Sequence, residues 1–250
     1  MNLLLFITHK SKFIHHNEKN IFRKYAKNFD KYIVLMNDDK NKIEEHFGIS
    51  CYKIFNPLSF DTSVKTNLNE KKFVFVGRIE KAKGVDLLLN AYKNYVNLGG
   101  NWKLNIIGDG SQKNEMIQKC HSLGLDRYVT FVGFTENVQK YLVDASISLI
   151  PSRWEGFGLV LTESMQFGLP TICFDLSPFK EITEGFKSSI LVEQFNIKRY
   201  AYEMYTLSSD KDKLEEMSLE AIKNSKVFEG KAIVKEWIKI FEELDKKNEN

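Results

Sequence analysis

The sequence predicts an α/β protein with one complete, doubly wound parallel sheet and a partial α/β segment in front of it. Short, continuous apolar runs recur along the chain, bounded by Gly, Asn or Asp. Such runs are typical of strands that are buried on both faces. Amphipathic stretches, with apolar residues three and four positions apart, lie between the runs and predict helices. The repeated alternation of strand and helix indicates a doubly wound sheet.

Each expected element follows from its local pattern. The apolar runs predict strands at residues 3–7, 33–36, 73–76, 104–107, 129–132, 147–150 and 171–174. The amphipathic stretches predict helices over residues 86–96, 114–123, 138–143 and 161–167. Asp38 and Asp39 are expected to start a further helix, and helical spacing of apolar residues resumes after Asp210.

A polar linker divides the chain near residue 60. The segment Asn56-Pro57-Leu58-Ser59 and the polar tract that follows it are the places where a boundary fits. Residues 1–60 hold about two βα units, too few for an independent core of ordinary size, so we interpret them as the remnant of a larger domain. Residues 61–225 hold five or six βα units, and residues 226–250 form a final helix.

The composition excludes several classes of protein. With 250 residues, 43% of them hydrophobic, the chain can bury a sizeable core, so it is neither disordered nor a mini-protein. A net charge of +3 gives no reason to expect a nucleic-acid partner. The three cysteines, Cys51, Cys120 and Cys173, are far apart and form no CxxC pair. They indicate a reducing compartment, and with no leader peptide or membrane span in the pattern we expect a cytoplasmic protein.

One regional charge feature stands out between Lys10 and Lys31. Seven Lys or Arg residues stand there against Glu18 and Asp30, and aromatic and aliphatic residues are interleaved with them. The segment fits an interfacial helix drawn to anionic lipid, which would make the protein peripheral on the inner face of the membrane. A helix with one packed face and one solvated basic face is the alternative interpretation, and we favour it.

The first candidate site follows the strand expected at residues 73–76. Gly77 ends that strand, and the cations Arg78 and Lys83 flank the turn into the next helix. In a parallel sheet, ligands bind beyond the carboxyl ends of the strands. A guanidinium fork and an ammonium suit a diphosphate, although a solvated loop with ordinary surface cations gives the same spacing.

The second candidate site follows the strand expected at residues 147–150. Gly156 and Gly158 let backbone amides approach a ligand, and a helix beginning near Phe157 would direct its positive end at an anion. Glu155 stays in the loop, whereas Glu163 lies in the helix, so the two carboxylates are not expected to form a metal pair. Helix capping by an acid is the alternative interpretation.

Two weaker signals follow other strands. Gly108-Asp109-Gly110 lacks the third glycine of a dinucleotide fingerprint and is better interpreted as a tight turn. Gly133-Phe134-Thr135 could read the edge of a base through its backbone, or it could be a turn before a helix capped by Asn137. Asp210-Lys211-Asp212 has the setting of a helix cap, and no HExxH, GxSxG or GxxxxGK[ST] frame occurs, so we expect no metal site.

Taken in order, these motifs resemble those of a known family. The motifs are Gly77-Arg78 with Lys83-Gly84, then Gly108-Asp109-Gly110, then Pro151-Ser152 through Glu155-Gly156-Phe157-Gly158 to Glu163, then Gly168-Leu169-Pro170. Their order and spacing resemble the retaining family 4 glycosyltransferases over about residues 30 to 245. The resemblance implies a GT-B fold, in which two Rossmann-like domains face each other and the C-terminal one holds a nucleoside diphosphate sugar. UDP-sugars are the favoured donors, with no cofactor and no metal.

The resemblance also implies roles for single residues. Arg78 and Lys83 would grip the donor diphosphate and neutralise charge on the leaving group, and Glu155 would contact the transferred sugar. Glu163 would bind the ribose hydroxyls. The backbone of Phe157, Gly158 and Leu159 would contact the sugar and phosphates, and the loop at Gly133 and Phe134 would contact the base. Residues 226–250 resemble the helix that returns to the N-terminal domain.

The chain departs from the family in its N-terminal part. Family members carry a full N-terminal domain that supplies most of the acceptor site, and only two of its βα units are expected here. Two functions follow. One is a retaining glycosyltransferase of surface polysaccharide synthesis, acting on a glycan or lipid-linked acceptor. The other is a truncated or non-catalytic nucleotide-sugar-binding subunit that needs a partner subunit or self-association. A GT-B-like phosphorylase or epimerase is disfavoured by the Glu-x7-Glu pattern.

Overall fold

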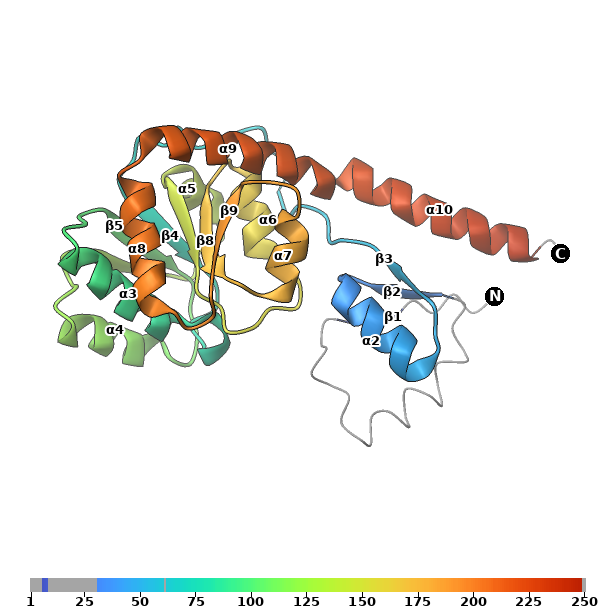
Figure 1. Ribbon diagram of the computed structural model, residues 1–250, viewed down its shortest axis with the longest axis horizontal. Coiled ribbons are helices and arrows are strands. Elements are labelled where there is room, and N and C mark those ends of the chain that lie inside the picture. The colour runs from blue at the N-terminus through green and yellow to red at the C-terminus, as the bar shows by residue number, and fades with distance from the viewer. Residues whose placement is uncertain (1–5, 9–30, 61, 249–250) are drawn as a thin grey trace. The chain divides into compact units, whose positions relative to one another are not determined.

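A computed structural model describes residues 6–8, 31–60 and 62–248 of the chain (Figure 1). The chain divides into two compact units. One comprises residues 1–58 together with 227–250, and the other comprises residues 59–226. The segment from Lys10 to Lys31, whose composition fits either a lipid contact or a packed basic helix, lies outside the described residues except for Lys31 itself.

The larger unit is built on a six-stranded parallel sheet of order β6-β5-β4-β7-β8-β9. Its strands are β4 (Lys72–Val76), β5 (Lys103–Ile107), β6 (Val129–Gly133), β7 (Ile147–Ile150), β8 (Thr171–Phe174) and β9 (Ser189–Val192). Its helices are η1 (Lys81–Lys83), α3 (Val85–Asn97), α4 (Lys113–Ser122), α5 (Val138–Val143), α6 (Leu159–Gln166), α7 (Ser177–Thr183), α8 (Ile197–Ser208) and α9 (Lys211–Ser225). This sheet confirms the predicted α/β class.

Both faces of the sheet are covered by helices, which explains the continuous apolar runs (Figure 1). Alternate residues of β4 point to opposite faces. Phe73 and Phe75 join the core that includes buried residues of α3, α4, α8 and α9. Val74 packs instead with Leu142 of α5 and with Phe167, directly after α6. A strand in this position needs apolar residues at every central position.

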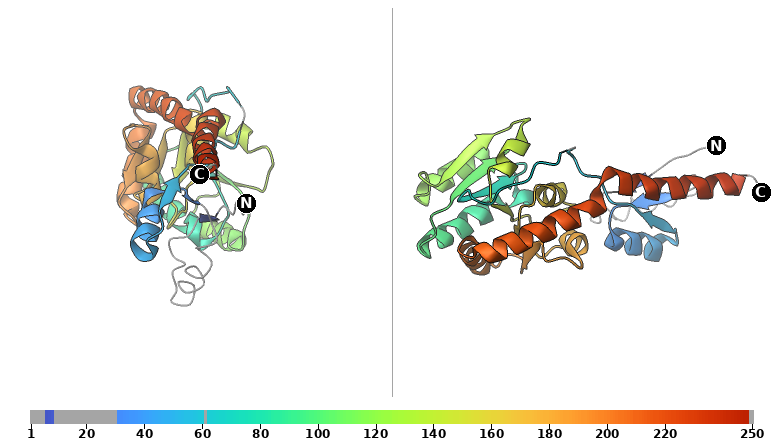
Figure 2. Two further views of the ribbon diagram at one scale, coloured as in Figure 1. Left: turned by 90° about the vertical axis from the view of Figure 1, so that its right-hand side faces the viewer. Right: turned by 90° about the horizontal axis from the view of Figure 1, so that it is seen from above.

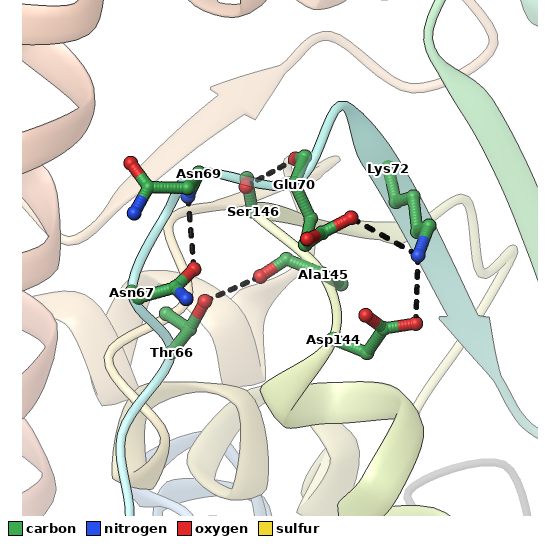
Figure 3. A network of polar contacts seen from close by, with 8 residues as sticks. All are labelled: Thr66, Asn67, Asn69, Glu70, Lys72, Asp144, Ala145 and Ser146. Atoms are coloured by element: carbon green, nitrogen blue, oxygen red, sulfur yellow. Dashed lines mark hydrogen bonds and ion pairs between the residues drawn. The ribbon is translucent and has the colours of Figure 1, made fainter.

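Polar contacts fasten the amino ends of β4 and β7 to each other (Figure 3). Lys72 donates to Asp144 at 2.9 Å and forms an ion pair with Glu70 at 3.1 Å. Ser146 donates its hydroxyl proton to the Glu70 carbonyl, and its amide donates to the Lys72 carbonyl. These contacts lie at the amino ends of the strands, whereas the candidate sites follow their carboxyl ends. They therefore help to fix the register of β4 and β7 without taking part in the site.

The smaller unit contains a three-stranded parallel sheet of order β1-β2-β3. Its elements are β1 (Phe6–Thr8), β2 (Tyr32–Val34), α2 (Asn37–Phe47), β3 (Cys51–Lys53), η2 (Lys226–Phe228) and α10 (Gly230–Asn248). Ile33 of β2 packs with Ile233 and Ile240 of α10, whereas Tyr32 and Val34 pack with Ile43 of α2. The two helices therefore cover opposite faces of this sheet (Figure 2).

The structure adds elements that the patterns did not predict. Strands β3 and β9 and helices α7 and α8 were not expected, and α6 begins at Leu159 and not near Phe157. Asp210 caps α9 by accepting a hydrogen bond from the Lys213 amide, as expected. Asn137 likewise caps α5 through the Lys140 amide.

Candidate functional site

The candidate site lies where the order of strands in the larger sheet reverses direction. The chain proceeds from β4 outward through β5 to β6, and then returns to β7 on the other side of β4. At such a switch point the loops after the two central strands diverge and leave room for a ligand. Here they are the loop of residues 77–84 after β4 and the loop of residues 151–158 after β7. These are the two strongest candidate loops of the sequence.

The two loops touch through their backbones. Gly84 has φ +71°, and a Cβ at this position would lie 2.1 Å from the carbonyl oxygen of Pro151. The amide of Arg153 donates to the carbonyl of Ala82 at 2.8 Å. Because a side chain at position 84 would clash with backbone, this contact requires glycine. The glycine in the Lys83-Gly84 motif is thus explained by loop packing.

Lys83 and Glu155 meet in a partly buried ion pair. The Lys83 ammonium donates to both carboxylate oxygens of Glu155, at 2.7 and 2.8 Å. The buried Ser152 hydroxyl donates to the same carboxylate at 2.7 Å. The Lys83 and Glu155 side chains are 23% and 11% exposed, so the pair is less screened than a surface pair. The structure therefore brings together two of the three residues expected to be catalytic.

Arg78, the third of these residues, lies apart from that pair. Its side chain is 69% exposed and its Nη1 lies 3.2 Å from Glu80 Oε1. Long exposed cations reorient at little energetic cost. Arg78 is therefore available to an approaching anion, whereas Lys83 would have to share its ammonium between the anion and Glu155.

Glu163 lies in the second turn of α6 and is half-buried. Burial raises the pKa of its carboxyl, and a hydrogen bond from Ser59 offsets part of that effect. Of the neighbouring residues predicted to contact a donor, Phe157 and Gly158 are buried, Gly156 is half-buried, and the Leu159 side chain is exposed. The α6 helix begins directly after Gly158, so its free amides face the loop that carries Glu155.

Phe134 stands out at the end of β6. Its side chain is 77% exposed, so most of the apolar surface of the ring faces water. Gly133, before it, has a buried backbone, and its carbonyl accepts a hydrogen bond from the Gly108 amide. The loop after β6 is thereby tied to the loop after β5, and Phe134 is placed at the same edge of the sheet as the other candidate residues.

Sequence reasoning did not single out three residues of the site. Ser152 supports Glu155, and Arg153 forms an ion pair with Asp86 at the start of α3. All three lie inside or next to the quoted motifs, so the signal was their position on adjoining loops. Finding them required knowing that β4 and β7 are neighbours. Among the described residues, no three His, Cys, Asp or Glu side chains are grouped so as to hold a metal ion.

Comparisons with known proteins agree on one family. The model of the family described as Glycosyl transferases group 1 matches residues 59–225. An uncharacterized glycosyltransferase of Haemophilus influenzae is 29% identical over 211 residues, which make up 83% of this chain and 60% of that protein. A poly(ribitol-phosphate) alpha-N-acetylglucosaminyltransferase of Staphylococcus aureus is 26% identical over 84% of this chain and 43% of that protein.

A solved structure extends the likeness to the fold. The crystal structure of TarM from S. aureus matches 96% of this chain and 50% of its own chain, with a TM-score of 0.85 and 23% identity. At this identity the likeness concerns the fold, and it confirms the predicted GT-B type. This chain spans about half the length of that structure and of the curated relatives just described. In the described part of the chain, no helix is long and apolar enough to cross a membrane.

Proposed function

Because this chain belongs to the group 1 glycosyl transferases, we propose that it binds a nucleoside diphosphate sugar at the loops after β4 and β7 and takes part in retaining sugar transfer of the family 4 type. The observation that carries the proposal is the Lys83–Glu155 pair at the switch point of the sheet. It places a cation and a carboxylate together at the position where open α/β sheets bind nucleotides.

The proposed roles follow from the chemistry of each group. In the transfer, the bond between the sugar and the diphosphate breaks and a bond to an acceptor oxygen forms, and the proton of the acceptor hydroxyl would pass to the departing diphosphate oxygen. Negative charge therefore grows on the leaving diphosphate, and Arg78 and Lys83 would stabilise it. Glu155 would orient Lys83 and accept hydrogen bonds from sugar hydroxyls. No resident cofactor is needed for these steps.

The remaining donor contacts are proposed from adjoining elements. Glu163 would accept hydrogen bonds from the ribose, and its raised pKa is consistent with a carboxylate short of donors. The amides at the start of α6, after Gly158, would donate to phosphate. The exposed ring of Phe134 and the backbone of Gly133 would contact the base. We favour UDP as the nucleotide, since UDP accompanies the structures of the pneumococcal transferase GtfA and of Anabaena HepE.

For the acceptor, we propose a glycan or lipid-linked sugar of surface polysaccharide synthesis. The names of relatives support this class: one from Erwinia amylovora is an amylovoran biosynthesis glycosyltransferase, and one from Campylobacter jejuni acts on a diphospho-undecaprenol-linked sugar. We place the reaction in the cytoplasm, where nucleotide sugars are made. Contact with the membrane through residues 10–31 remains part of this proposal.

A calorimetric titration tests the donor site directly. The full chain is titrated with UDP, GDP and ADP, without and with magnesium, and the series is repeated on Arg78→Ala. We expect selective binding that does not require magnesium and that weakens in the variant. Absence of binding to every nucleotide would refute the donor site. Binding without sugar transfer to any acceptor would support the alternative, a nucleotide-sugar-binding subunit that needs a partner.

A further inference from the structure

Arg153 joins the two loops of the candidate site through its side chain and its backbone. Its guanidinium donates to both carboxylate oxygens of Asp86, each at 2.7 Å, and also to the carbonyl of Lys81 at 2.8 Å. Its amide donates to the carbonyl of Ala82 at 2.8 Å. A single residue of the loop after β7 thus holds the loop after β4 at two adjacent carbonyls and the first turn of α3 at one carboxylate.

These contacts surround Lys83 in the sequence. Lys81 and Ala82 immediately precede it, and Asp86 follows it by three residues in the first turn of α3. On the other loop, Arg153 stands two residues before Glu155. The backbone that carries the lysine and the backbone that carries its carboxylate partner are therefore fixed to each other by Arg153.

The pair of Arg153 and Asp86 is built more firmly than a surface ion pair. The two side chains are 20% and 31% exposed, and their contact is bidentate. Burial alone would raise the pKa of Asp86, but the hydrogen bonds and charge of Arg153 outweigh it, with help from Lys119, and the pKa lies below its usual range. The carboxylate therefore stays ionised at neutral pH and keeps the guanidinium in place.

We propose that Arg153, held by Asp86, is a positioning residue that brings Lys83 and Glu155 into register for the donor diphosphate. This inference rests on the proposed function for its purpose, but the positioning itself is a property of the free protein. Arg153 points its donors at Asp86 and at backbone carbonyls, so it acts through Lys83 and does not contact the donor itself.

The geometry also specifies which substitutions preserve the contact. Lysine offers a point charge and cannot bind two carboxylate oxygens and a carbonyl with one planar fork. Arg153→Lys should therefore behave almost like Arg153→Gln. Asp86→Asn keeps the shape of the partner and removes its charge, so it is the milder variant and serves if Arg153→Gln does not fold.

The first test reads the position of Lys83 without any ligand. The full chain is treated with formaldehyde and a borohydride, and the methylation rate of each lysine is followed by mass spectrometry. We expect the rate at Lys83 to rise severalfold in Arg153→Gln and Asp86→Asn while the rates at other lysines stay unchanged. Asp144→Asn is the matched control, because it breaks the ion pair with Lys72 at the amino end of β4, and it should leave the methylation rate at Lys83 unchanged. An unchanged rate at Lys83 in the first two variants overturns the proposal.

The second test is a double-mutant cycle on the affinity for UDP. Arg153→Gln should raise the Kd about tenfold, a coupling typical of residues that belong to one network of hydrogen bonds and ion pairs. In a chain that already carries Lys83→Ala, it should add almost nothing, because the group it positions is gone. Additive losses would show that Arg153 acts independently of Lys83. If the unaltered chain binds no nucleotide, the proposed function fails, whereas the methylation rates still decide whether Arg153 positions Lys83.

Discussion

Replacing Lys83 by methionine should separate the stability of the site from its binding function. The variant keeps most of the volume of the side chain and removes the ammonium that donates to Glu155 at 2.7 and 2.8 Å. Glu155, only 11% exposed, then keeps the hydrogen bond from the Ser152 hydroxyl and loses both of those from Lys83. A buried carboxylate that loses its charged partner should destabilise the fold.

The magnitude follows from the burial of the pair. Removing the partner of a buried acceptor costs about 1–3 kcal/mol of folding free energy. Because the Lys83 side chain is 23% exposed and water can partly replace it, we expect a loss in the lower half of that range. For a domain of this size, a loss of about 1–2 kcal/mol corresponds to a fall in Tm of about 2–8 °C. If Lys83 also binds the donor diphosphate, the Kd for UDP should rise by roughly 10- to 150-fold, equivalent to about 1.5–3 kcal/mol.

A second substitution distinguishes the two effects. In Lys83→Met with Glu155→Gln, the buried charge is gone, so most of the lost Tm should return. Binding should stay weak, since the missing cation is not restored. Thermal melts followed by differential scanning calorimetry and UDP titrations of Lys83→Met, of the double variant and of the wild type provide the comparison. Wild-type affinity in the double variant would refute the assignment of Lys83 to the donor, whatever the melts show.

Three further outcomes are expected. Burial raises the pKa of Glu163, so ionisation of this carboxyl lowers the stability of the fold as the pH rises through that pKa. Glu163→Gln should therefore have a higher Tm than the wild type at neutral pH and the same Tm in acid, and it should bind UDP less tightly. A collapse of its Tm at neutral pH would show that the residue is structural. Arg78→Ala should weaken UDP binding roughly tenfold or more and leave the Tm unchanged, because the side chain is 69% exposed; equal affinity would remove Arg78 from the site. Asp144→Asn should cost up to about 1 kcal/mol in unfolding measurements and leave UDP binding intact, and impaired binding would contradict the separation of the two sheet edges.

The strands of the larger sheet were predictable because each is a short apolar run between polar or glycine-rich turns. The run at residues 147–150, for example, matches β7 at both ends. β3 was missed because its three residues, Cys51–Lys53, include only partly apolar side chains. Helix α8 carries Tyr200, Met204 and Leu207 at helical spacing, all buried, so the sequence does contain a local signal for this helix.

The parts of the site were predictable, but their contacts were not. Glycine, cations and carboxylates directly after apolar runs identified the two loops. The Lys83–Glu155 pair spans 72 residues of sequence, and its existence depends on β7 returning to the side of β4. No local pattern contains that information. For the same reason Arg153 was quoted only as a member of a motif, although it makes the contacts that join the loops.

The amino and carboxyl ends of the central strands β4 and β7 differ in the charge around them, and this difference favours an anion at the carboxyl ends. At the amino edge, the network drawn in Figure 3 contains one cation, Lys72, against the carboxylates of Glu70 and Asp144. At the carboxyl edge, residues 77–86 and 151–158 contain four Lys or Arg and three Asp or Glu, a balance of 4 − 3 = +1. The free amides at the start of α6 add positive potential at this same edge. If the proposed function holds, a nucleoside diphosphate, with its charge concentrated in the diphosphate, would therefore be attracted to the carboxyl ends of these strands, where Lys83 and Arg78 lie. Because Lys83 is already paired with Glu155, the attraction has to come from the loops as a whole, which is why the contacts that hold the two loops together should matter to binding as much as the lysine does.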